Sequence, residues 1–166
     1  MKNRLSWILL AALWVAFASY VAFTAAQLPA QVATHFGASG APNGWMTRAE
    51  HVRFTLLFGA LIPAFIVGLF AWIRSRAGRG LNIPNKDYWL SAERRQATFD
   101  FIQWQGFLFA GMLIVFLAAI HHSILAANAR HPVSLGAEAG RIGGIFTGAV
   151  IMWLAIFIVR FYRKTE

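Results

Sequence analysis

Four long stretches without a charged residue constrain what this chain can fold into. They cover residues 5–26, 54–73, 106–127 and 142–159. A helix rises about 1.5 Å per residue, so each stretch is about long enough to cross the roughly 30 Å hydrocarbon core of a bilayer. Hydrophobic residues make up 58% of the chain, more than a soluble domain of this size can bury. The sequence therefore predicts an all-α polytopic membrane protein with four transmembrane helices.

The positive charge lies mostly on one side of these stretches. That side carries Lys2, Arg4, Arg74, Arg76, Arg79, Lys86, Arg94, Arg95, Arg160, Arg163 and Lys164, and the other carries Arg48, Arg53, Arg130 and Arg141. Basic residues favour the cytoplasmic side, so both termini are predicted to be cytoplasmic. The charge is expected to meet anionic headgroups of the lipid bilayer, with no nucleic acid as a partner.

The spans leave no room for a separate soluble domain. We expect a single membrane domain over residues 1–166, with outer loops at 27–53 and 128–141 and a cytoplasmic loop at 74–105. The chain contains no cysteine, which excludes disulfides and thiol catalysis. The central parts of the spans hold no ionisable residue, which argues against a proton-coupled transporter and an intramembrane aspartyl protease.

Glycines recur at every fourth position near the start of the last span, at Gly136, Gly140, Gly144 and Gly148. Residues four apart share a helix face, and a face without side chains lets another helix approach closely. We expect a helix of the same chain to pack there. The alternative is a homo-oligomer through Gly140, Gly144 and Gly148.

Two loops carry motif-like runs. The outer loop contains Leu28-Pro29, Thr34-His35-Phe36, Gly40 and Pro42-Asn43-Gly44-Trp45, and its glycines and Pro42-Asn43-Gly44 predict tight turns. The apolar Phe36, Trp45 and Met46 are expected to hold this loop against the bundle or the interface. The cytoplasmic loop contains Asn82-Ile83-Pro84-Asn85-Lys86-Asp87-Tyr88-Trp89-Leu90, followed by Glu93-Arg94-Arg95.

The outer run resembles the signature of a bacterial membrane family catalogued as domain of unknown function 1648. This module also occurs in membrane proteins that confer immunity to the sporulation-delaying protein toxin and take part in its signalling. The cytoplasmic run resembles the second shared element of such proteins. The resemblance implies a small multi-pass helical protein of the bacterial plasma (inner) membrane, and it carries over no reaction.

The two runs supply the candidate binding residues. The outer set is His35, Phe36, Gly40, Pro42, Asn43, Gly44 and Trp45, and the cytoplasmic set is Asn82, Pro84, Asn85, Lys86, Tyr88 and Trp89. His35 either shapes a receiving surface or hydrogen-bonds the loop. The cytoplasmic set either caps and turns the chain beside lipid phosphates or docks a cytoplasmic partner through Tyr88 and Trp89.

All five histidines fall on the outer half of the predicted topology. Neutral imidazole binds zinc and copper well, which makes His35, His51, His121 and His122 candidate metal ligands, with Glu50 as a further ligand or base. Their spacing matches no standard metal motif. The competing interpretation is that these histidines are interfacial or hydrogen-bonded and purely structural.

Three hypotheses for function follow. The leading one is a non-enzymatic protein that binds a peptide, lipid or protein partner at its outer loop, in immunity, envelope sensing or signalling. The second is a membrane metalloenzyme that uses the outer histidines. The third is an accessory subunit of a larger membrane complex.

Overall fold

Four long helices dominate the fold. In the computed structural model, which describes residues 2–76 and 81–163, they are α1 (Lys2–Thr24), α2 (Arg48–Ser75), α4 (Arg95–Asn128) and α5 (Ala137–Tyr162). All four are long and apolar enough to cross a membrane, which confirms the predicted fold class of a multi-pass helical protein. Among the predicted basic residues, Arg79 and Lys164 lie outside the described residues.

All four long helices begin before their uncharged stretches do, α1 at Lys2. α2 begins at Arg48, α4 at Arg95 and α5 at Ala137. The start of α2 shows why: the Thr47 hydroxyl accepts a hydrogen bond from the Glu50 N–H, and the Glu50 carboxylate accepts one from the Thr47 N–H. This reciprocal capping box satisfies helix-end donors, so the helix extends beyond its apolar part.

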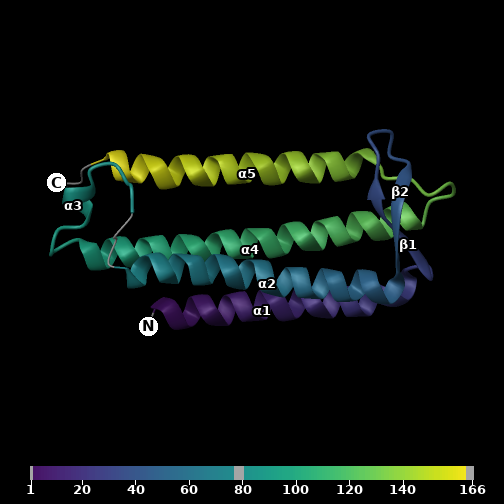
Figure 1. Cartoon of the computed structure of the whole chain (residues 1–166), viewed down its shortest axis with the longest axis horizontal. Helices are drawn as coiled ribbons and strands as arrows, with labels where there is room; N and C mark the ends of the chain where they lie inside the picture. The colour runs from purple at the N-terminus through teal and green to yellow at the C-terminus, as the bar shows by residue number, and fades with distance from the viewer. Residues whose placement is uncertain (1, 77–80, 164–166) are drawn as a thin grey trace.

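α1, α2 and α4 form a packed group, and α5 lies along α4 (Figure 1). Phe17 and Val21 of α1 share a buried cluster with Ile114 of α4. Two glycines allow this close packing. A Cβ atom at Gly59 of α2 would collide with the Phe17 ring, and one at Gly106 of α4 would lie 2.7 Å from the Phe70 ring.

Stacked aromatic rings attach α5 to α4. Ring pairs occur between Phe116 and Phe146, between Phe109 and Trp153, and between Phe101 and Phe157, with centroid separations of 4.1, 4.8 and 6.0 Å. The Trp153 indole N–H also donates to the Gln105 Oε1 at 2.6 Å. Offset aromatic stacking stabilises such pairs by about 0.5–1.5 kcal/mol beyond the area they bury.

The glycine face of α5 has no partner within the described part of the chain. A Cβ atom added at Gly140, Gly144 or Gly148 would meet nothing within 4 Å. The expectation that a helix of the same chain packs there is therefore wrong. The aromatic residues of α5 face α4 instead, and they turn the glycines away from the bundle.

The first outer loop is a β-hairpin rather than a turn-rich coil. Strands β1 (Gln31–Phe36) and β2 (Pro42–Thr47) pair antiparallel, and the short helix η1 (Ala25–Gln27) precedes them. Pro42, Asn43 and Gly44 were expected to form a tight turn, but they lie in β2. The chain turns at residues 37–41 instead, where the Gly37 N–H donates to the Ala41 C=O at 2.9 Å and Gly40 has φ of +79°.

The two ends of the bundle differ. The hairpin lies at one end, and the start of α1, the end of α5 and the short helix α3 (Lys86–Trp89) lie at the other (Figure 1). We call these the hairpin end and the α3 end. Which end faces the cytoplasm stays a prediction from the charge distribution.

Candidate functional site

Asn128, the last residue of α4, fixes the hairpin to the bundle. Its Oδ1 accepts a hydrogen bond from the Ala33 N–H at 2.8 Å, and its Nδ2 donates to the Ala33 C=O at 2.9 Å. The same Nδ2 donates to the Ile124 C=O at 2.9 Å. The side-chain amide thus takes the place of a neighbouring strand at the outer edge of β1. Leu28 and Val32 pack against Ile124 beneath it.

The tip of the hairpin reaches the connection between α4 and α5. The Leu135 N–H donates to the Gly40 C=O at 2.9 Å. A Cβ atom at Gly40 would lie 2.7 Å from the Leu135 carbonyl oxygen, so both the positive φ and the close approach require glycine there. Leu135 directly precedes Gly136, the N-cap of α5. The hairpin therefore extends across the end of the bundle, from α1 and α2 to the start of α5.

The hairpin holds all the predicted outer residues, and three of them, His35, Asn43 and Trp45, are exposed. His35 Nδ1 and Asn43 Oδ1 form a hydrogen bond across the two strands, which supports the structural alternative for His35. Gly44 lies against His35, because a Cβ atom at Gly44 would be 2.8 Å from the His35 Cβ. Phe36, which pairs with Pro42, packs against the cluster beneath the hairpin as expected.

Trp45 is the large exposed side chain of the hairpin. It keeps 51% of its surface exposed, so it does not pack onto the bundle. Its neighbour Met46 is half-buried.

The two edges of the hairpin are unequal. Ala33 pairs with Trp45, and both backbone polar groups of Ala33 bond to Asn128, away from β2. In an antiparallel ladder the N–H and C=O of a residue point to the same side. The backbones of Ala33 and Trp45 are therefore not hydrogen-bonded to each other. The N–H and C=O of Trp45 point instead to the open edge of β2. The next N–H that points to this edge is that of Thr47, and it donates to the Glu50 carboxylate.

A chain of hydrogen bonds lies beneath the hairpin among three buried side chains, Thr24, His51 and His121. The Thr24 hydroxyl donates to the Tyr20 C=O at 2.7 Å, so it accepts from the His121 Nε2 at 2.9 Å. His121 then carries its hydrogen on Nε2, and its Nδ1 accepts from the His51 Nε2 at 3.2 Å. This assignment lets both imidazoles remain neutral.

The structure brings together only two of the four candidate metal ligands. His51 and His121 are adjacent, whereas His35 is bonded within the hairpin and the exposed His122 is bonded to the Tyr20 hydroxyl at 3.0 Å. Within residues 2–76 and 81–163, no group of three or more histidines, cysteines or acidic residues is arranged to hold a metal ion. Glu50 serves the capping box of α2.

The comparison with known families identifies the first part of the chain. Residues 6–67 match the family described as Domain of unknown function (DUF1648). The chain contains a DUF1648 domain. The match covers most of α1, the whole hairpin and much of α2. No curated protein and no solved structure gives a significant match to the chain.

The candidate site joins the DUF1648 domain to the rest of the chain. The domain supplies the hairpin, Thr24 and His51, whereas α4 supplies His121 and Asn128. The sequence analysis did not find Thr24 or Asn128. The sequence does contain one signal for Asn128. An asparagine directly after an uncharged stretch carries polar groups that must find hydrogen-bond partners.

The cytoplasmic set holds the end of α5. Asn85, in the left-handed region at φ of 51°, donates from its Nδ2 to the Phe161 and Tyr162 carbonyls at 3.0 and 3.2 Å. The Trp89 indole N–H donates to the same Phe161 carbonyl at 3.0 Å. These bonds satisfy carbonyls that the last turn of a helix leaves unpaired. Asn85 and Trp89 thus cap the end of α5.

The remaining members of this set differ in exposure. Trp89 is buried, so its ring is out of reach of a docking partner, and Tyr88 is half-buried with the Arg94 guanidinium 4.2 Å from its ring centroid. Asn82 and Lys86 are exposed, and Pro84 is half-buried. Glu93 precedes α4, and hydrogen bonding to the backbone lowers the pKa of its carboxyl below the usual value.

Proposed function

We propose that this protein is a non-enzymatic binding protein of the bacterial plasma membrane, which receives an extended peptide segment of its partner at the open edge of β2. One observation carries the proposal. The hairpin is fixed in place, with one edge closed by Asn128 and the other edge open at Trp45.

The open edge offers what an extended peptide needs. A strand that adds to a sheet edge gains main-chain hydrogen bonds, and neighbouring side chains supply its specificity. Here Trp45 provides one N–H and one C=O, and its half-exposed indole provides an apolar contact beside them. Aromatic side chains of this kind are enriched among the residues that dominate binding energies.

Immunity or envelope sensing is the biological form that the resemblance to toxin-immunity proteins favours. The hairpin lies within the residues that match DUF1648, and the charge distribution favours an outer location for the hairpin end. Cells that express the chain should then survive exposure to a peptide toxin that is lethal to cells without it.

A photo-crosslinking amino acid in place of Asn43 would test the proposal in cells. Asn43 is exposed on β2, two residues from Trp45. We expect a defined adduct with a partner, and no such adduct from the same group at Phe23, a residue of α1 that is 82% exposed. Equal adducts from both positions would show that the hairpin has no specific partner.

A pair of substitutions at Trp45 then separates the backbone from the side chain. Trp45→Ala removes the indole, whereas Trp45→Pro removes the indole and the edge N–H together. Proline is tolerated at an edge position whose N–H faces outward. The adduct should decrease in Trp45→Ala and disappear in Trp45→Pro. Equal adduct yields from the two variants would exclude strand addition while leaving a contact by the side chain.

A second candidate function is supported by the open glycine face of α5. An accessory subunit of a larger membrane complex would seat a partner helix against Gly140, Gly144 and Gly148, as a second copy of this chain would. Extraction in a mild detergent followed by mass measurement tests this candidate. A larger assembly that Gly144→Leu disrupts would support it, and a monomer would exclude it.

A further inference from the structure

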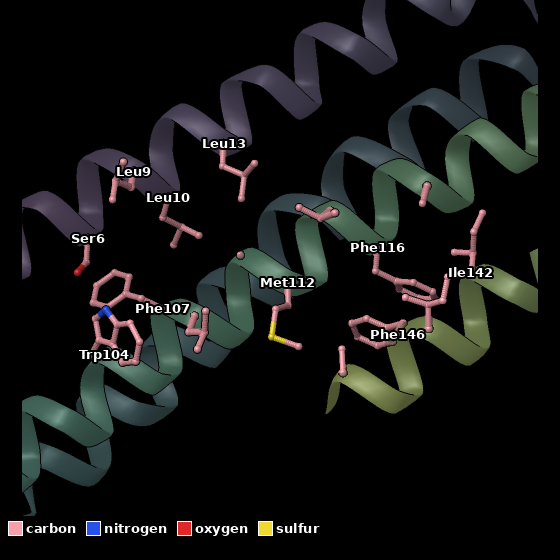
Figure 2. A pocket seen from close by; sticks show the side chains of 16 residues that line it. Ser6, Leu9, Leu10, Leu13, Trp104, Phe107, Met112, Phe116, Ile142 and Phe146 are labelled. Atoms are coloured by element: carbon pink, nitrogen blue, oxygen red, sulfur yellow. The ribbon is translucent and has the colours of Figure 1, made fainter. Parts of the chain in front are cut away.

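An apolar groove lies on the face of α4 between α1 and α5. Figure 2 shows side chains of all three helices around one space, with Ser6 and Trp104 at one end and Ile142 and Phe146 at the other. The groove has a volume of about 610 Å³, and Ser6 is the one lining side chain among the described residues that carries a hydroxyl group. Its position between membrane-spanning helices opens it to the bilayer rather than to water.

We propose that this groove binds one acyl chain of an anionic phospholipid, with the headgroup at the α3 end. This site is separate from the hairpin and goes beyond the proposed function. Nothing in the proposal depends on a partner at β2.

The volume of the groove selects a hydrocarbon chain over a helix. A helix is about 10 Å wide and needs about 30 Å to cross a membrane, so it occupies on the order of 2,000 Å³. All of the empty space in the groove, including the part at its open side, is about 1310 Å³, which is less than such a helix fills. Along α4 it extends from Trp104 to Ala119, about 22 Å at 1.5 Å per residue. This long and narrow shape suits a flexible chain.

The walls are accessible from the side. Leu9 of α1 and Ile145 of α5 line the groove and are 61% and 73% exposed. α5 contacts α4 through its aromatic residues and is fixed at its two ends, by Leu135 beside its N-terminus and by Asn85 and Trp89 at its C-terminus. An acyl chain can therefore enter between α1 and α5 without any separation of packed helices.

The charge at the α3 end selects an anionic headgroup. Arg4 lies two residues before Ser6, and the Arg160 guanidinium lies 4.3 Å from the ring centroid of Phe101, one turn before Trp104. Arg94 and Arg95 begin α4 at the same end. Of the acidic residues there, Asp100 is paired with Arg74 at 2.7 Å, and Asp87 and Glu93 leave a basic excess. Arginine binds phosphate oxygens through two parallel hydrogen bonds.

Native mass spectrometry of the detergent-purified full chain tests the proposal. The probes are phosphatidylglycerol and phosphatidylcholine with identical acyl chains. We expect about one phosphatidylglycerol per chain to be retained, with phosphatidylcholine bound about tenfold more weakly, a difference of about 1.4 kcal/mol. Equal binding of the two lipids, or the absence of a retained lipid, would overturn the proposal.

Two variants fill the groove from different helices. Ala149→Trp on α5 and Ala119→Trp on α4 place an indole among the lining side chains, and both should lower phosphatidylglycerol retention about tenfold because the indole occupies the space of the chain. Ala155→Trp is the matched control, since Ala155 is exposed on α5 and lies outside the lining.

The variants also test whether the lipid binds elsewhere and whether a second copy of the chain fills the groove. Unchanged retention in both filled variants, with Ala155→Trp as stable as the wild type, would place the lipid elsewhere and overturn the proposal. A wild-type dimer that both filled variants convert to a monomer would overturn it in favour of a second copy of the chain in the groove. If one variant does not fold, the other variant and the comparison of the two lipids still decide the question.

Discussion

Asn128 and Ala33 are joined by two hydrogen bonds that replace a missing strand, because one side-chain amide satisfies both backbone groups of one strand residue. This pair connects α4 to the hairpin of the DUF1648 domain. One of the contacts that hold the hairpin on the bundle is therefore made by a side chain outside the matched region.

Asn128→Leu tests this connection. Leucine has a similar size but leaves the Ala33 N–H and C=O without partners in a buried place, and each such loss costs about 1–3 kcal/mol. We expect a lower melting temperature in detergent and faster hydrogen exchange of the amides in residues 31–47. Ser123→Ala on the same helix is the control, because its hydroxyl donates only to the Ala119 C=O within α4. Unchanged exchange in Asn128→Leu would mean that the hairpin is held by its apolar contacts alone.

The chain of hydrogen bonds from His51 through His121 to Thr24 makes a second prediction. Thr24→Val keeps the shape of the side chain but removes the acceptor for the His121 Nε2–H. A buried donor without a partner costs about 1–3 kcal/mol, so we expect a clear loss of thermal stability. Nitrogen NMR of the His121 ring should report its hydrogen on Nε2 in the wild-type protein.

Thr24→Ser is the matched control for this prediction, because serine keeps the hydroxyl. It should retain most of the stability and the same His121 tautomer. If Thr24→Val were as stable as Thr24→Ser, or if the NMR signals placed the hydrogen on Nδ1, the direction of the chain given above would be wrong.

Trp89 gives a third prediction, at the other end of the molecule. Trp89→Phe preserves an aromatic ring beside Phe161 but removes the N–H that donates to the Phe161 carbonyl. We expect a modest destabilisation of about 1 kcal/mol and faster hydrogen exchange in residues 157–163. The hairpin amides should not change. A variant with unchanged exchange at the end of α5 would show that Asn85 alone is sufficient to hold it.

The sequence predicted the helices because long uncharged stretches leave a chain in a membrane few alternatives. It did not predict the hairpin, because the glycines and Pro42-Asn43-Gly44 suggest turns, and Asn128, which bonds to the edge of β1, is distant in sequence. It also misjudged the glycine face of α5. Spacing shows that Gly140, Gly144 and Gly148 share a face, but only the positions of Phe146, Trp153 and Phe157 show that another face of α5 meets α4.

The cytoplasmic set shows the same limit. Its residue types suggested capping and turning, and Asn85 donates hydrogen bonds to the end of α5. The target of those bonds, the last turn of α5, lies more than seventy residues away in sequence and could not be read from local pattern. The four candidate metal-binding histidines show a second limit. They share the same chemistry, but the structure distributes them over three separate hydrogen-bonded pairs, and residue type could not predict this.

Two glycine substitutions make the last prediction. Alanine stabilises an exposed helix interior over glycine by about 1 kcal/mol. Gly144→Ala should show this gain, because nothing lies within 4 Å of the added Cβ atom. Gly59→Ala should instead destabilise the protein, because its Cβ atom would collide with the Phe17 ring between α1 and α2. Melting temperatures measured in one detergent, with the oligomeric state of each variant, provide the test. A loss of stability in Gly144→Ala together with dissociation of an assembly would reveal a partner helix on the glycine face, and a gain in Gly59→Ala would contradict the close packing of α1 on α2.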